Sequence, residues 1–469
     1  MSVHPSHKTA QRDRIPASEK LALGLGQAAA MGTHNALTTL ANPVYNVMMG
    51  MSPVYLSVLT GLQRLWDAFL DLFVGQFSDR LRTRWGRRRP MILIAALPMA
   101  AGFASVWFFP RRMGEAALLL NFLTSSLLFY TFHSFYSVPL TALQAEATLD
   151  YHERTRVASV VGICTWAFSL SNQWLYPLIQ SKVFVDPVAG VRWVAGASAA
   201  VYAVMAFSPA LFVRERPLAE SVNRSKGEPF FRALRQTWHN RDFLILLGVR
   251  SVSQLGYSIV AVFSFYLNCY LVHGGDLRAA SAIQGWLGTS YVVASVASFW
   301  IFRLLALRLG KQRTLQIAAG VLIVGAIVKA VVYQPGWRWP QLIVTATNGT
   351  ALAGISLMTT SMLADIVSED ELKTSRRREG LYCSVISWVD KLGSSTGALL
   401  SGFLLVGAGF DVKLGGHQAA VTLQLMKWIY VIFPLVGAVI TVLLAHFYTL
   451  TEARAYEVKR ALEIQEAQP

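Results

Sequence analysis

Apolar runs of about 20 residues recur along the whole chain, separated by shorter polar stretches. A helix of about 20 apolar residues crosses the roughly 30 Å hydrocarbon core of a bilayer, and runs of this length are too long for barrel strands. The pattern therefore predicts an all-α membrane protein. Twelve spans are expected, at residues 22–47, 54–78, 90–109, 116–143, 157–180, 193–213, 243–271, 281–302, 314–333, 340–364, 381–406 and 420–448.

The longest polar interruption divides these spans into six and six. It covers residues 214–242 and is basic. We expect two six-helix halves, at 22–213 and 243–448, joined by this linker and flanked by polar ends at 1–21 and 449–469. Two matches between the halves indicate an internal repeat. Gly and clustered cations follow the second and eighth spans, and an acid, an acid and a base at intervals of four end the fourth span (Glu146, Asp150, Arg154) and the tenth (Asp365, Glu369, Lys373).

Composition and charge fit a membrane protein. Only 14% of the residues are charged, against about 25% in soluble proteins. The net charge of +16, taken alone, would indicate a nucleic-acid partner. However, most Lys and Arg fall in loops on one side of the predicted membrane, which by the positive-inside rule is the cytoplasm. We therefore expect no nucleic acid, a lipid bilayer as partner, and both termini in the cytoplasm.

The second span carries three ionisable groups, Arg64, Asp67 and Asp71, on one helical face. Each charge at the centre of a bilayer costs roughly 2.5–3.5 kcal/mol. Three of them on one segment indicate partners or a wet cavity, so the segment is a candidate ion-coupling site. The alternative is a structural ion pair of Arg64 with Asp67, or of Asp71 with Lys391.

Several motifs carry a family resemblance. The run Gly75-x-x-Ser78-Asp79-Arg80 followed by Gly86-Arg87-Arg88-Arg89 resembles the loop motif of the major facilitator superfamily. More narrowly, the chain resembles the glycoside–pentoside–hexuronide:cation symporters of the melibiose-carrier type. The motifs that carry this second resemblance are Arg64-x-Trp66-Asp67-x-x-x-Asp71, Arg84-Trp85-Gly86-Arg87, Val138-Pro139, Asp150-x-x-Glu153-Arg154-x-Arg156, Ala364-Asp365 and Val389-Asp390-Lys391-Leu392-Gly393-Ser394.

The resemblance implies a twelve-helix carrier that alternates access and couples cation entry to sugar uptake. It implies that Asp67 and Asp71 bind the cation, that Arg64 lies beside them and that Lys391 is their counter-charge. Ser387 falls where the sugar carriers have a polar contact.

Departures from the family pattern change the expected solute and ion. Met31 and Ser137 stand where melibiose carriers have acidic sugar-binding residues, and Gly162 stands where they have an arginine, so galactoside specificity is not expected. Leu70 replaces an Asn beside the second carboxylate. Two carboxylates without other polar ligands suit a proton better than a hard cation that needs several oxygens. The expected coupling ion is H⁺ before Na⁺, with no other cofactor and no metal site.

Two further groups complete the predicted site residues. The first lines a substrate cavity, and the second holds helices together at the cytoplasmic ends. For the first group, the alternatives are hydroxyls bonded to the carbonyl four residues back, a histidine that only packs, and interfacial tryptophans; a proton-relay role is a further alternative for His133. For the second group, the alternative is that the charges serve membrane topology alone. The first group is His133, Ser137, Thr141, Asn172, Trp174, Ser387 and Trp388, and the second is Asp79, Arg80, Arg87, Arg88, Glu146, Arg154 and Asp365. Arg250 is expected to serve the substrate or to extend its side chain to headgroups. Asp390 is expected to pair with another residue or to face the cytoplasmic end.

These features together predict a secondary active transporter of a sugar, glycoside or uronide, as a monomer in a bacterial inner membrane. No phosphate-binding glycine loop or nucleophile elbow is visible, so neither ATP-driven transport nor enzyme activity is expected. Two alternatives stay open: a facilitator or lipid-type carrier of the same fold, and a non-transporting assembly factor or sensor. The solute, the direction of transport and the choice between H⁺ and Na⁺ also stay open.

Overall fold

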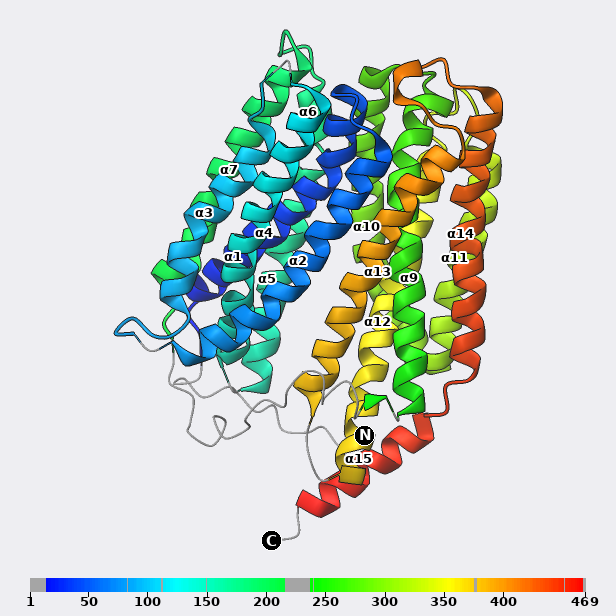
Figure 1. Ribbon diagram of the computed structural model, residues 1–469. Coiled ribbons are helices and arrows are strands. Elements are labelled where there is room, and N and C mark those ends of the chain that lie inside the picture. The colour runs from blue at the N-terminus through cyan, green and yellow to red at the C-terminus, as the bar shows by residue number, and fades with distance from the viewer. Residues whose placement is uncertain are drawn as a thin grey trace. The chain divides into compact units, whose positions relative to one another are not determined.

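The computed structural model describes residues 14–81, 83–110, 113–148, 150–215, 237–238, 240–374, 378–450 and 452–466. The chain divides into two compact units (Figure 1). Unit 1 comprises residues 1–51 and 65–225, and unit 2 comprises residues 52–64 and 226–469. The boundary near residue 64 falls inside one long helix, and each unit is described by itself.

Unit 1 is a bundle of helices. α1 packs against α5 and α7, and α3 packs against α4 and α7. Trp66 Nε1 also donates to Thr131 Oγ1 at 3.0 Å, which ties α2 to α4. The elements are α1 (Ala17–Ala41), the π-helical η2 (Asn42–Met48), α2 (Pro53–Arg80), α3 (Arg89–Trp107), α4 (Glu115–Glu146), α5 (Tyr151–Asn172), α6 (Leu175–Ile179) and α7 (Pro187–Phe212).

Unit 2 repeats this arrangement of packing partners. α9 packs against α13 and α14, and α11 packs against α12 and α14. These pairs match those of α1 and α3 in unit 1, and a π-helical segment follows both α1 and α9. The repeat predicted from the loops therefore extends to the helix packing. The elements are α9 (Arg241–Tyr266), η4 (Leu267–Val272), α10 (Leu277–Leu309), α11 (Lys311–Val332), α12 (Gln341–Thr374), α13 (Glu379–Gly407), η5 (Val412–Leu414), α14 (Ala420–His446) and α15 (Glu452–Glu466).

Within the described residues, eight helices are long and apolar enough to cross a membrane by length and composition: α3, α4, α7, α9 with η4, α10, α11, α12 and α14. The predicted spans at 22–47, 54–78, 157–180 and 381–406 fall on α1, α2, α5 and α13, which lie outside this set because they are more polar. α2 carries the charges at 64, 67 and 71, and α13 carries those at 390 and 391. Two of these four helices, α2 and α13, thus hold the predicted coupling residues.

Small residues in α1 allow close packing against α7. A Cβ atom at Gly26 would lie 2.2 Å from Cγ of Pro209, and one at Gly32 would lie 2.7 Å from Cε1 of Tyr202. Larger side chains at these positions would push the helices apart. Lipid provides no hydrophobic drive between helices, so such close contact is a main source of their attraction.

One part of the predicted repeat is wrong. Glu146, Asp150 and Arg154 do not share a helical face, because α4 ends at Glu146 and α5 begins at Tyr151. Asp150 is the N-cap of α5, and its carboxylate accepts the Glu153 backbone N–H at 2.7 Å. The cap satisfies an otherwise unpaired amide and so favours the break. In unit 2 the helix α12 does continue through this region, and Lys373 pairs with Glu369 at 3.0 Å.

Candidate functional site

Asp67 is the centre of a buried polar group in unit 1. Its side chain projects from α2, and the residue is only 3% exposed. Ser134 Oγ on α4 donates to Asp67 Oδ1 at 3.1 Å. Nδ1 of His133, also on α4, lies 3.8 Å from the same oxygen. A carboxylate therefore stands inside the bundle, beside a hydroxyl donor and a group that takes up protons.

His133 joins this group to α1. Its Nε2 lies 3.3 Å from the Ala30 carbonyl oxygen. Its ring contacts Phe129 on its own helix, and the His34 ring on α1 at a centroid distance of 5.6 Å. We expected His133 to line a substrate cavity. The structure places it beside Asp67, where it is buried, and brings α1, α2 and α4 together at one ionisable cluster.

The other predicted coupling residues lie on α2 and α13. Asp71 lies one turn after Asp67 on α2 and is half-buried. Arg64 is on the same helix but belongs to the segment grouped with unit 2, and Lys391 is half-buried on α13. The roles of Arg64 and Lys391 stay predictions.

Several predicted substrate contacts have local partners. Thr141 Oγ1 donates to the Ser137 carbonyl four residues back at 2.9 Å. Asn172 Nδ2 donates to the Gly32 carbonyl at 2.9 Å, and its Oδ1 accepts from the Tyr202 hydroxyl. The amide of Asn172 thus serves the packing of α1, α5 and α7. Ser387 is exposed, while Trp174 and Trp388 are half-buried, and their substrate role stays a prediction.

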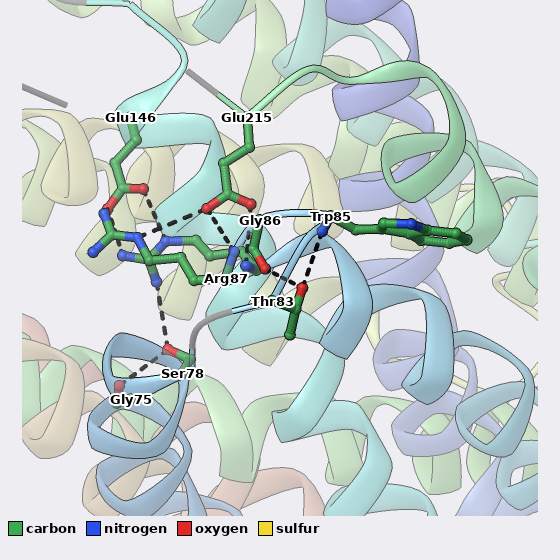
Figure 2. A network of polar contacts seen from close by, with 9 residues as sticks. Gly75, Ser78, Thr83, Trp85, Gly86, Arg87, Glu146 and Glu215 are labelled. Carbon is green, nitrogen blue, oxygen red and sulfur yellow. Dashed lines mark hydrogen bonds and ion pairs between the residues drawn. The ribbon is translucent and has the colours of Figure 1, made fainter. Parts of the chain in front are cut away.

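A second polar cluster surrounds the loop between α2 and α3 (Figure 2). Arg87 Nη2 donates to Glu146 Oε1 at 3.1 Å, and Arg88 Nε donates to Glu146 Oε2 at 2.9 Å. Arg88 Nη1 also reaches Ser78 Oγ on α2 at 3.4 Å. Because Arg88 is only 5% exposed, it links α2, the loop and α4 in a largely buried position. The predicted contact among Arg87, Arg88 and Glu146 is present, whereas the side chains of Asp79 and Arg80 lie outside the described part of the structure.

The carboxylate of Glu215, just after α7, binds backbone amides of the same loop. Its Oε1 accepts the Arg87 N–H at 3.0 Å, and its Oε2 accepts the Arg88 N–H at 3.1 Å. Gly86 has a φ of 101°, a conformation that other residues rarely adopt. A Cβ at Gly86 would lie 2.1 Å from Glu215 Oε2, so the glycine allows the carboxylate to reach both amides.

Glu215→Gln is expected to loosen this loop. An amide side chain carries no charge and has one carbonyl oxygen, so it can accept only one of the two backbone N–H groups, and without charge assistance. A charge-assisted bond contributes about 2 kcal/mol, which corresponds to roughly 30-fold faster tryptic cleavage within residues 80–89 when the loop opens reversibly. Limited proteolysis with mass spectrometry measures this rate. Glu115→Gln, at an exposed position at the start of α4, is the matched control, and equal rates in the two variants would contradict the anchoring role.

The remaining predicted residue of unit 1, Arg154, donates to the Ala145 carbonyl at 3.2 Å. Its neighbour Glu153 is buried and binds Lys20 Nζ at 2.5 Å, the Ile15 N–H at 3.0 Å and Arg156 at 3.1 Å. Burial alone would raise the pKa of Glu153, but these donors outweigh it and hold the pKa below its usual value. The start of α1 is thereby fastened to α5.

Two charge pairs of unit 2 involve Asp390 and Asp365. Arg250 on α9 binds Asp390 on α13 through two bonds, one of them 3.0 Å from Nε to Oδ1, and donates to Thr359 Oγ1 on α12 at 3.2 Å. Arg250 therefore pairs with Asp390 within the bundle. Lys311 pairs with Asp365 at 2.6 Å and also donates to the Ser361 carbonyl.

The sequence reasoning missed Ser134, Glu215 and Lys311 as members of these clusters. Ser134 lies next to His133 in the sequence, and serines in transmembrane helices ordinarily bond their own backbone, so no sequence signal marks it. Glu215 is an acid within a basic loop, and Lys311 opens a helix one residue after a glycine. A search for an opposite charge to pair with Arg87, Arg88 or Asp365 would have pointed to either residue.

Comparisons with known proteins agree on one family. Residues 22–452 match the family described as MFS/sugar transport protein. An uncharacterized symporter of Synechocystis is 22% identical over 97% of this chain and 98% of its own length. The isoprimeverose transporter of Lactiplantibacillus pentosus is 24% identical over 93% of this chain and 89% of its own.

A solved structure shares the fold. A bacterial homolog of the human lysosomal transporter Spinster aligns with a TM-score of 0.63 at 15% identity, over 94% of this chain and 96% of that chain. The fold class predicted from the sequence, an all-helical major facilitator fold, is confirmed at this level. The chain is thus a multi-pass membrane transporter and not an enzyme, and it belongs to the MFS/sugar transport protein family.

Proposed function

We propose that this chain couples the entry of a proton to the uptake of a sugar, glycoside or uronide across a bacterial inner membrane. The family match and the isoprimeverose transporter among its relatives support a carbohydrate substrate. Twelve membrane-spanning helices, with both termini in the cytoplasm, are part of this proposal. The observation that carries it is the buried carboxylate of Asp67, which meets a hydroxyl donor and His133 inside unit 1.

The coupling follows from the electrostatics of this carboxylate. A charge within the membrane is costly unless it is neutralised or paired. Proton binding at Asp67 and Asp71 lowers the cost of turning this face toward the substrate cavity. Sugar then binds, and the polar contacts that hold helices together at the cytoplasmic ends break. The substrate cavity then closes to the outside and opens to the cytoplasm. Release of the proton to the cytoplasm restores the charge and resets the carrier.

Proteoliposomes test this proposal. The purified protein should concentrate a labelled member of a panel of pentosides, hexosides and uronides when an inward proton gradient is imposed, and a protonophore should abolish this accumulation. Accumulation driven only by Na⁺ would keep symport but overturn the choice of ion.

The same assay separates the alternatives. Equilibration without accumulation would indicate a facilitator, and flux of lysolipid without sugar flux would indicate an amphiphile carrier. A protein that moves no solute in vesicles while remaining folded would instead be an assembly factor or sensor.

A further inference from the structure

The contact between His133 and Asp67 requires a proton. A carbonyl oxygen only accepts hydrogen bonds, so the contact of His133 Nε2 with the Ala30 carbonyl at 3.3 Å places a proton on Nε2. The other nitrogen, Nδ1, then carries a lone pair in the neutral ring. This Nδ1 is buried, makes no hydrogen bond within the described residues, and lies 3.8 Å from Asp67 Oδ1. A lone pair facing a carboxylate is repulsive, whereas an added proton makes the contact attractive.

We propose that Asp67 and His133 together form the site that carries the coupled proton. This inference rests on the proposed function and names its ion and a second residue that binds it. When the proton arrives, a bond forms between it and Nδ1, and the resulting imidazolium donates to Asp67 Oδ1. When it leaves, the N–H bond breaks and the lone pair returns to Nδ1. No other bond changes, and no oxidant or reductant is needed.

The surroundings of the pair favour a proton over Na⁺. Ser134 already directs its hydrogen toward Asp67 Oδ1, so its hydroxyl satisfies that oxygen as a donor. The facing ligand is a ring nitrogen, while hard cations require several oxygens. One nitrogen and one carboxylate oxygen instead hold a proton in the geometry of a charge-assisted hydrogen bond.

Other ionisable groups near the pair come from the same three helices. α1 contributes His34, whose ring lies 5.6 Å from that of His133. α4 contributes Tyr130, at a ring distance of 6.3 Å. α2 contributes Asp71, one turn beyond Asp67, and Arg64, about one turn before it. His34 is more exposed than His133, and its ring contact with His133 places it next to the buried pair.

His133→Gln separates proton binding from packing. The Gln Nε2 amide keeps a donor for the Ala30 carbonyl, but no atom at the Nδ1 position can take up a proton. We expect counterflow exchange of sugar within about threefold of wild type, while proton-driven accumulation falls at least tenfold, and the pH profile of substrate affinity differs from that of wild type. His446→Gln, at the end of α14 in unit 2, is the matched control. Normal accumulation with an unchanged pH profile in His133→Gln would overturn the inference.

A second measurement needs no transport. Imidazole ¹⁵N spectra of the purified protein identify His133 as the signal that the Gln variant lacks. We expect the Nε2–H tautomer at high pH, and a second, hydrogen-bonded proton on Nδ1 at low pH that Asp67→Asn removes. An Nδ1–H tautomer at high pH, or no effect of Asp67→Asn, would contradict the pair. If these spectra agree but no sugar is transported, the proposed function fails and the proton site stands.

Discussion

Asp67→Asn is expected to abolish concentrative sugar uptake while leaving sugar exchange intact. One charge moving through 100 mV gains about 2.3 kcal/mol, which supports roughly 50-fold accumulation. An Asn side chain is nearly the same size and still accepts from Ser134, but it holds no exchangeable charge. The variant should therefore equilibrate sugar to a ratio of about one under the same proton gradient. Measurement of labelled sugar inside proteoliposomes, with and without an imposed gradient, gives the accumulation ratios of wild type and variant.

Two further variants sharpen this result. Asp71→Asn should also abolish accumulation, because the two carboxylates lie on one face of α2 and share the coupling role in the proposed function. Ser134→Ala keeps both carboxylates and removes only the 3.1 Å hydrogen bond. It should lower uptake moderately and still concentrate sugar. If Asp67→Asn still concentrated its substrate, the buried carboxylate would not be the coupling group.

Gly349→Val is expected to destabilise unit 2 more than other single substitutions discussed above. A Cβ at this position in α12 would lie 2.4 Å from the Tyr291 backbone oxygen and 2.8 Å from Ser295 Oγ, both on α10. Backbone atoms cannot rotate away, so the two helices must separate. Forcing extra methyl groups into such a contact costs about 3 kcal/mol, or a fall in melting temperature of roughly 6–12 °C.

Gly320→Val is the matched control for this substitution. Gly320 lies within α11, and among the described residues no heavy atom outside its chain neighbours and local helix backbone lies within 4 Å of a Cβ built there. The two variants share the change in helix propensity, which for Val and Gly differs by only a few tenths of a kcal/mol. Thermal unfolding of the two purified variants should thus isolate the cost of the helix contact. Equal melting temperatures would show that α10 and α12 do not pack as closely as described.

Local patterns were sufficient to identify the helices and to predict which carboxylates couple transport to an ion. Long apolar runs specify helices because no other structure satisfies the backbone inside lipid. Asp67 and Asp71 were recognisable because charges on an apolar helix are costly and so mark function. The break between Glu146 and Tyr151 was missed, since a four-residue spacing fits one helix as well as two, and the N-cap bond of Asp150 decides between them. Thr141 likewise bonds its own helix, a choice that hydropathy alone does not reveal.

The sequence by itself determined that this chain is a helical membrane protein, and it predicted two related halves and a coupling role for the acidic pair on the second predicted span. Only the tertiary structure decided that His133 and Ser134 flank Asp67, that Glu215 holds the Arg87 and Arg88 amides, and that Arg250 meets Asp390. The physical reason is the separation in sequence between the residues that interact. Helix formation and membrane insertion depend on neighbouring residues, whereas these contacts join residues 66 to 140 positions apart, and their register is set by the packing of whole helices.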